Sequence, residues 1–330
     1  MLNFITKFLL NKEIVVCNLH RQTLPVVNNR ENRKDYIFMD VLYLWRIFPI
    51  SGKYKLKFKV MYFVLNLVNP KYIIDINWTS KWNSLYKVWT KKHQKSKFIV
   101  FQHGSYRGGV VTDRIHRYTK CDIFFTWSDY FTDLFKKYNC DKRTEIITFG
   151  NPIYNRNERD EYKYQNKSHG KILFIPTAIL EHRLKDYLDM SDKLKKIGFS
   201  VEIKEHNYQG RRIQRSGGDL YFPKIEDIVK VDGDLEIILK NNEFDLIISD
   251  NSTALLDAIY FKNKVLYFAP DYFRKEYVSN QYSKFLKNIF YNFQNFKKME
   301  DLYNCVSLEA QEKLLNNMIY KGDNILGNYL

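Results

Sequence analysis

The 330-residue sequence has few cysteines, few glycines and prolines, and no long uncharged apolar run. The four cysteines lie far apart and form no CxxC pair: Cys17, Cys121, Cys140 and Cys305. This spacing argues against a zinc site and a disulfide scaffold, and it fits a reducing cytoplasm. The apolar stretches 1–10 and 62–68 are too short for a signal peptide or a spanning helix. We therefore expect a cytoplasmic protein that is soluble or peripheral on a membrane.

Acidic residues are scarce relative to basic ones. The chain has 53 Lys and Arg against 37 Asp and Glu, a formal net charge of +16. Such an excess favours an anionic partner, which can be a substrate, a membrane surface or a nucleic acid. Lysines are spread along the whole chain, and no zinc-finger spacing or RNA-binding signature is present. We expect anionic substrates and the anionic inner face of the cell membrane as partners, and no nucleic acid.

Apolar runs of strand length alternate with segments of helical spacing. Strands are predicted at 14–16, 72–76, 97–101, 122–127, 145–149, 171–175, 200–204, 246–248 and 265–268. Helices are predicted at 36–50, 54–67, 84–93, 129–138, 184–197, 225–240 and 254–261, with two or more within 284–330. Strands that alternate with helices are typical of a parallel, doubly wound α/β sheet.

A polar stretch divides the chain near its middle. Residues 155–170 read NRNERDEYKYQNKSHG, and we interpret this segment as an interdomain linker. It separates a Rossmann-like domain at 1–160 from a second one at 161–330, whose last helices can pack back on the first. We expect the two domains to face each other across a cleft.

The stretch 245–271 reads as strand, turn, helix and strand. Short polar side chains at 250–253 follow the first strand and favour a turn and a helix start. In an α/β protein this unit brings Ser252, Thr253 and free backbone N–H groups to the carboxyl edge of a parallel sheet, where phosphates bind. A capped helix without a ligand is the alternative interpretation.

Five short motifs follow one another in the order found in a known family. They are His103-Gly104 after a strand, Gly150-Asn151-Pro152 after a strand, Pro176-Thr177, His206, and Asp250-Asn251-Ser252-Thr253 with Asp257. This pattern, over roughly residues 97 to 271, resembles GT-B transferases, most closely the CDP-glycerol glycerophosphotransferase group of wall and capsule enzymes. Three departures leave donor and acceptor open: Gln102 replaces Trp, Ala178-Ile179 replaces Trp-Arg, and Glu205 replaces Pro.

The resemblance implies a GT-B fold and a transferase without a bound metal or cofactor. Its substrates would be a CDP-, CMP- or UDP-linked donor and a lipid-linked or polysaccharide acceptor. The transferred group would be a sugar or a polyol phosphate, added to a capsule, O-antigen or teichoic-acid-like polymer. The implied donor-binding residues are Thr177, His206, Arg211, Asn251, Ser252 and Thr253. The implied residues of the acceptor side or the cleft are Gly104, Ser105, Arg107, Asn151 and Asp257.

The two motif histidines are the candidates for chemistry. His103 follows a buried strand on a glycine-containing loop, and an imidazole there suits a general base for an acceptor hydroxyl. His206 precedes Arg211, and cationic donors there would stabilise charge on a departing nucleotide. The predicted strands before His206 and before Ser252-Thr253 are expected to be adjacent, so these two segments should converge on the donor phosphates. The alternatives are a packed loop histidine at His103, a solvated basic loop after His206 and a dipole role for Asp257.

Two other functions stay open. The chain can be a non-catalytic glycan-binding or assembly protein on a degenerate GT-B scaffold. It can also be a sugar-nucleotide epimerase on the same fold, although the acidic and histidine residues of that family have no match in this sequence.

Overall fold

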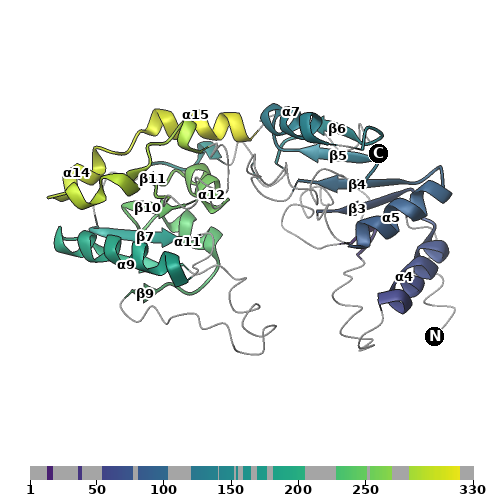
Figure 1. Ribbon diagram of the computed structural model, residues 1–330, viewed down its shortest axis with the longest axis horizontal. Helices are drawn as coiled ribbons and strands as arrows, with labels where there is room; N and C mark the ends of the chain where they lie inside the picture. The colour runs from purple at the N-terminus through teal and green to yellow at the C-terminus, as the bar shows by residue number, and fades with distance from the viewer. Residues whose placement is uncertain are drawn as a thin grey trace. The chain divides into compact units, whose positions relative to one another are not determined.

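The computed structural model contains two separate parallel sheets (Figure 1). It describes residues 13–17, 36–38, 54–76, 81–102, 120–139, 141–151, 154, 159–164, 169–176, 181–204, 228–250, 253–269 and 282–319. The chain divides into two compact units with the main boundary after residue 155. Unit 1 takes in 1–106, 110–155 and 317–330, and unit 2 takes in 107–109 and 156–316. The α/β fold with two Rossmann-like sheets, as in GT-B proteins, is confirmed, and no continuous sheet runs through the described residues from 97 to 269.

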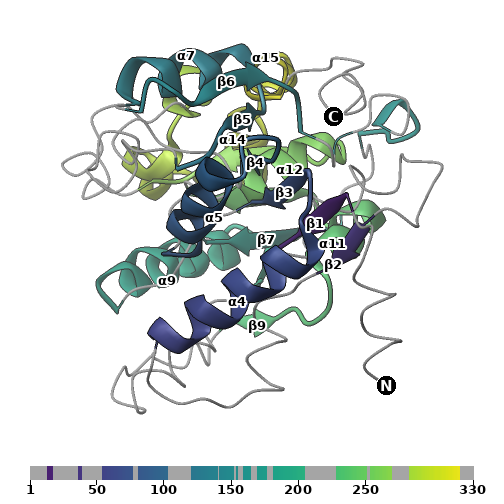
Figure 2. The ribbon, with the colours of Figure 1, turned by 90° about the vertical axis from the view of Figure 1, so that its right-hand side faces the viewer.

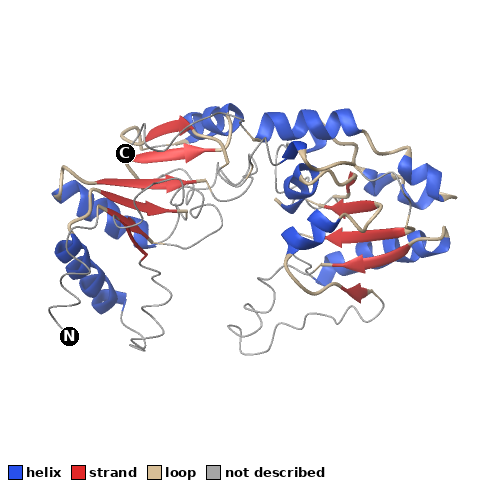
Figure 3. Cartoon of the chain, turned by 180° about the vertical axis from the view of Figure 1, so that it is seen from behind, coloured by secondary structure: helices blue, strands red, loops and turns tan. Residues whose placement is uncertain are grey.

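The sheet of unit 1 has the order β2-β1-β3-β4-β5-β6, and every pairing in it is parallel. Its strands are β1 (Ile14–Val16), β2 (Tyr36–Phe38), β3 (Tyr72–Asp75), β4 (Lys97–Phe101), β5 (Ile123–Thr126) and β6 (Glu145–Thr148). The helices described in this unit are α4 (Tyr54–Val68), α5 (Lys81–Lys92) and α7 (Asp129–Tyr138). Figure 3 shows the strands of each sheet running in one direction with helices beside them.

The sheet of unit 2 has the order β11-β10-β7-β8-β9 and is again parallel throughout. Its strands are β7 (Lys171–Ile175), β8 (Ser200–Ile203), β9 (Val229–Lys230), β10 (Leu246–Ser249) and β11 (Val265–Tyr267). The helices among the described residues of this unit are α9 (Glu181–Lys196), α11 (Leu235–Asn241), α12 (Ala254–Tyr260), α14 (Met299–Tyr303) and α15 (Leu308–Met318). Within 282–298 the chain forms the short 3₁₀ turns η2 (Tyr282–Lys284), η3 (Ile289–Tyr291) and η4 (Phe293–Asn295).

The central strands are buried on both faces, which explains their continuous apolar runs. All four residues of β5 and of β10 are buried. In unit 1 the rings of Phe101, Phe125 and Phe149 pack against one another, with centroids 4.7 to 5.3 Å apart. In unit 2 a larger apolar cluster joins the sheet to α9 and to the segment around η3 and η4. Each unit therefore has its own hydrophobic core.

Two helix predictions are wrong in part. Tyr36–Phe38, expected to begin a helix, forms β2, because its aromatic and β-branched side chains suit a strand and β1 provides a parallel partner. The helix expected at 225–240 begins only at Leu235. Gly233 adopts a positive φ of 105°, which interrupts a helix, and the Asp234 carboxylate accepts from Glu236 N and caps the new start.

Part of the predicted linker belongs to unit 2. Oε1 of Glu312 on α15 accepts hydrogen bonds from Arg159 Nη2 at 2.6 Å, Tyr164 Oη at 2.8 Å and Lys262 Nζ at 2.9 Å. The Arg159 side chain is 5% exposed, and that of Glu312 is 30% exposed. Residues 159–164 are thus held by a partly buried ionic cluster, although the stretch 155–170 is polar from end to end in the sequence.

No helix in the described part of the chain is both long enough and apolar enough to cross a bilayer.

The Glu312 cluster generates a stability prediction. Burial alone would raise the pKa of Glu312, but the hydrogen bonds from Arg159, Lys262 and Tyr164 outweigh it and lower this pKa from 4.5 to about 2. Glu312→Gln should lower the free energy of unfolding by about 1–3 kcal/mol at neutral pH, because Arg159 loses its counter-charge. Urea denaturation of both proteins measures this difference.

The pH dependence has a defined sign. A carboxylate whose pKa is lower in the folded state contributes its full stabilisation of the fold at pH values above its ordinary pKa. This contribution disappears as the pH falls through the pKa of the folded state. The difference between wild type and Glu312→Gln should therefore shrink between about pH 4.5 and 2. Glu309→Gln, on the exposed start of the same helix, is the control and should change little. An equal loss from both substitutions would contradict the role of the cluster.

Candidate functional site

The carboxyl edge of the second sheet is the part of unit 2 that can hold a ligand. The chain proceeds from β7 outwards through β8 and β9, and then crosses back to β10 on the other side of β7. The order of the strands therefore reverses between β7 and β10. In open α/β sheets, the crevice outside the carboxyl ends of such a strand pair is the usual ligand position.

The register of the sheet brings two of the sequence motifs to the same level. Ser249, the last residue of β10, pairs with Ile175, the last residue of β7. The Ser249 hydroxyl donates to the carbonyl of Ile175 at 2.7 Å, and Phe268 N donates to the Ser249 carbonyl at 3.0 Å. Pro176 and Asp250 therefore leave the sheet next to each other, and both are buried. These contacts fix where the two motif loops begin.

Two predicted site residues lie at the start of α12. Thr253 precedes the helix, and its carbonyl accepts from Leu256 N at 2.9 Å and Asp257 N at 3.3 Å. Asp257 is in the first turn of α12 and is buried, with 3% of its surface exposed. A carboxylate at this position is favoured by the helix dipole. The dipole role that the sequence left open for Asp257 is thus consistent with its position.

One geometric expectation needs correction. The segments after β8 and β10, which contain His206 and Ser252-Thr253, were expected to follow adjacent strands. The structure has β7 between β8 and β10. Parallel neighbours lie about 4.8 Å apart, so the two strand ends are roughly 10 Å apart and flank the end of β7. This order could not be read from the sequence, since strands that follow one another along the chain need not pair.

In unit 1, Gln102 connects the end of β4 to the end of β5. Its amide oxygen Oε1 accepts from Trp127 N at 2.9 Å, and its carbonyl accepts from Trp127 Nε1 at 3.0 Å. Its own N–H donates to the Phe125 carbonyl at 2.9 Å. The side chain is fully buried. Gln102, a departure from the family pattern, is therefore a structural anchor at the residue directly before His103.

The Gly150-Asn151 turn leaves the sheet on the other side of β5. Phe149 N and Gly150 N both donate to the Thr126 carbonyl, at 2.9 and 3.0 Å. Gly150 has a positive φ of 98°, which other residues rarely adopt. Asn151 is buried, with 4% exposed. Gln102 and Asn151 thus flank the end of β5, so that two of the motifs leave one edge of the first sheet.

Most of the predicted site residues lie outside the described residues. These are His103, Gly104, Ser105, Arg107, Thr177, His206, Arg211, Asn251 and Ser252. Sequence reasoning did not assign a role to Gln102 or to Ser249. A polar residue that ends an apolar strand directly before a motif is the signal by which both could have been found.

The buried thiols do not suit chemistry. Burial, with a smaller contribution from Asp75, raises the pKa of Cys17 well above its ordinary value, and burial also raises the pKa of Cys121. A protonated buried thiol is a weak nucleophile. Within the described segments, no three His, Cys, Asp or Glu side chains gather as metal ligands.

Comparison with known proteins gives structural similarity alone. No family model matches the chain, and no curated protein sequence matches it. A Listeria monocytogenes protein named as a UDP-N-acetylglucosamine 2-epimerase has a TM-score of 0.57 at 16% identity, over 96% of this chain and 94% of that one. The wall teichoic acid polymerase TagF has a TM-score of 0.53 at 15% identity, over 98% and 88%.

A glycosyltransferase from Rickettsia africae has a TM-score of 0.50 at 14% identity, over 97% of both chains. A chain of the GtfA/B complex has a TM-score of 0.46, and this chain spans 57% of its length. The likenesses to the epimerase, TagF and the Rickettsia africae protein show the fold, which transferases and epimerases have in common, and they leave the reaction to the residues of the site.

Gln102 generates a prediction about this edge. Gln102→Ala should lower the free energy of unfolding by about 1–3 kcal/mol, because it leaves the buried Trp127 N–H without its acceptor. Trp127→Phe removes only the indole donor and keeps the Gln102 Oε1 contact. It should lower the free energy of unfolding by about 0.5–1.5 kcal/mol for the lost hydrogen bond, with a further loss from the poorer packing of the smaller ring. Chemical denaturation of both variants provides the comparison, and a neutral Gln102→Ala would contradict the anchoring role.

Proposed function

We propose that this chain is a GT-B transferase. It moves a sugar or polyol phosphate from a CDP-, CMP- or UDP-linked donor onto a polysaccharide or lipid-linked acceptor of the cell surface. TagF and a glycosyltransferase share this fold with epimerases. The five motifs in the order found in transferases support transfer over epimerisation, because the acidic and histidine residues of the epimerase family have no match in the sequence. Attachment to the inner face of the cell membrane belongs to the same proposal.

One observation carries the donor half of the proposal. The strand order of unit 2 reverses between β7 and β10, and two of the family-like motifs begin at Pro176 and Asp250, where these strands end side by side. Ligands of doubly wound sheets bind outside such a pair. The nucleotide phosphates are therefore assigned to Thr177, Asn251, Ser252 and Thr253, with His206 and Arg211 after β8 supplying positive charge.

The acceptor half rests on the first sheet. His103 follows the anchored residue Gln102 at the carboxyl edge of β4. We assign it as the base that removes the proton from the acceptor hydroxyl, while the acceptor oxygen attacks the sugar carbon or the phosphorus of the donor. The bond to the nucleotide breaks, and the nucleotide leaves with the electron pair. Gly104, Ser105, Arg107, Asn151 and Asp257 are assigned to the acceptor side or the surroundings of the reacting groups.

Two other outcomes are distinguishable from transfer. A non-catalytic glycan-binding protein would release no nucleotide from any CDP-, CMP- or UDP-linked donor. An epimerase would convert a UDP-sugar into its epimer without an acceptor. Nucleotide release that depends on an added acceptor is the result expected of a transferase.

The donor site can be tested by calorimetry with free nucleotides. The combined Ser252→Ala and Thr253→Ala variant should bind the preferred nucleotide about 1–3 kcal/mol less tightly, because charge-assisted hydrogen bonds to phosphate are lost. Ser307→Ala, at the exposed start of α15, is a control that should bind like the wild type. Unchanged affinity of the double variant for every nucleotide that binds the wild type would exclude this site.

The base can be tested at saturating donor. His103→Ala should reduce turnover by about 10²–10⁴-fold and leave donor binding nearly intact, because a general base acts on the acceptor proton. His206→Ala should weaken donor affinity as well as the rate. Near wild-type turnover of His103→Ala would show that this loop has a packing role instead.

A further inference from the structure

The helix α4 has more apolar surface than unit 1 covers. Met61, Leu65 and Val68 are buried. On its outer side, Val60, Phe63 and Leu67 recur at intervals of three and four residues, and they are 41%, 62% and 40% exposed. A surface helix normally presents polar side chains on the face turned away from the core. These three residues instead form an exposed apolar row along one side of α4.

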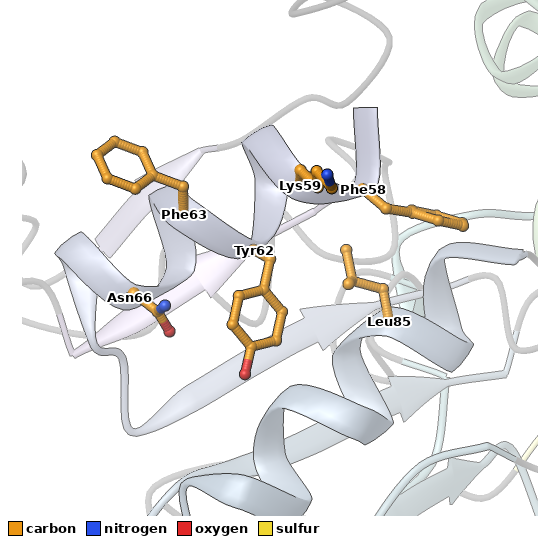
Figure 4. A pocket seen from close by; sticks show the side chains of 6 residues that line it. All are labelled: Phe58, Lys59, Tyr62, Phe63, Asn66 and Leu85. Atoms are coloured by element: carbon orange, nitrogen blue, oxygen red, sulfur yellow. The ribbon is translucent and has the colours of Figure 1, made fainter. Parts of the chain in front are cut away.

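A groove between α4 and α5 continues this row. It has a volume of about 380 Å³ and is lined by Phe58, Lys59, Tyr62, Phe63, Asn66 and Leu85 (Figure 4). The side-chain oxygen Oδ1 of Asn66 accepts a hydrogen bond from Trp89 Nε1 at 2.8 Å, which links the two helices at the groove. Val88 of α5 is also exposed, at 52%. Figure 2 shows α4 in front with α5 beside it. Phe63 belongs both to the exposed row and to the groove, and the groove reaches Leu85, so α4 and α5 share this apolar surface.

The formal net charge is concentrated in the part of the sequence that contains α4 and α5. From residue 41 to residue 112 the sequence has 13 Lys and Arg and one acidic residue, Asp75, which is buried at the end of β3. This stretch contributes +12 of the formal net charge of +16, so the other 258 residues contribute +4. Lysines are spread along the whole chain, whereas carboxylates are almost missing from this stretch.

The helices α4 and α5 show the same excess of basic over acidic residues. Together α4 and α5 contain seven lysines and no Asp or Glu. Lys59, Lys91 and Lys92 are exposed, and Lys92 Nζ lies 5.6 Å from the centroid of the Tyr62 ring at the groove. Cationic side chains therefore border the apolar surface, and no carboxylate on either helix opposes them.

We propose that the α4–α5 face, comprising Val60, Phe63, Leu67, Val88 and the lysines around them, docks on a lipid bilayer that contains anionic headgroups. An exposed apolar row next to lysines is the pattern of a helix that lies in the membrane interface, where apolar burial and attraction to anionic lipid add together. Nucleic acid would use the lysines but leave Phe63 and Leu67 without a partner. The inference rests on the membrane attachment in the proposed function and assigns it to one face of unit 1. Its failure is distinguishable from a failure of the proposed transfer, because vesicle binding and nucleotide binding are measured separately.

The apolar half is tested by flotation of the full chain with phosphatidylcholine vesicles, with and without phosphatidylglycerol. The wild type should bind the anionic vesicles at low salt and be released at high salt. Phe63→Ser should weaken this binding about tenfold, since it removes one large side chain from the interface. Ile237→Ser on α11 of unit 2 is the matched control, because Ile237 is 61% exposed, and it should bind like the wild type.

The basic half uses a second matched pair. Lys91→Gln with Lys92→Gln, at the end of α5, should weaken vesicle binding by about 30-fold, as expected for two lysines near an anionic surface. The control is Lys195→Gln with Lys196→Gln, at the corresponding end of α9 in unit 2. It removes the same two positive charges and should leave vesicle binding unchanged.

Three results with vesicles would overturn the proposal: no binding by the wild type, equal losses of binding from the two lysine pairs, or binding that Phe63→Ser leaves unchanged. A fourth is dissociation of a dimer by Phe63→Ser, measured by sedimentation velocity, while vesicle binding is unaffected. Phe63 is largely exposed, so its substitution should leave the circular dichroism spectrum and the thermal midpoint unchanged.

Discussion

The parallel arrangement of both sheets is the constraint on which the rest of this structure depends. Parallel strands bring all their carboxyl ends to one edge, so segments far apart in the sequence leave the sheet at the same level. In unit 2 the pairing of Ser249 with Ile175 joins chain segments 74 residues apart. In unit 1 the end of β5 holds Gln102 on one side and Gly150 on the other. The motifs are thus gathered by backbone pairing before any side chain takes part.

The sequence predicts those parts of the fold whose signal is local. Lys97–Phe101, Asp129–Tyr138 and Lys171–Ile175 have the predicted bounds, because each is a clear apolar run or an amphipathic period between polar residues. Elements that depend on a distant partner were not predicted. Tyr36–Phe38 and Val229–Lys230 are strands because β1 and β8 pair with them. The Arg159–Glu312 ion pair spans 153 residues, and no local pattern indicates it.

The candidate site divides in the same way. Motif order placed residues after the ends of strands, and the strands exist where they were predicted. The order of those strands within the sheet was not available from the sequence, and so β8 and β10 were expected to be adjacent although β7 separates them. The roles of Gln102 and Ser249 were missed because each is defined by its partner on another strand. The sequence therefore indicates which residues follow the ends of strands. Which of these residues are neighbours in space depends on how the strands pair in the sheet.

Hydrophobic periodicity predicts an apolar face on a helix, but it does not indicate whether that face packs in the core or lies on the protein surface. The apolar spacing of α4 predicted a helix correctly, and from that pattern alone Phe63 and Leu67 would be assigned to the core together with Met61 and Leu65. Burial separates the two rows, and the absence of carboxylates on α4 and α5 gives the exposed row a chemical context. The fold that transferases and epimerases share does not explain this surface, because the candidate ligand positions lie at the carboxyl edges of the two sheets and the exposed row lies on α4. The exposed row is thus a property of this chain, to be explained by what it contacts rather than by how it folds.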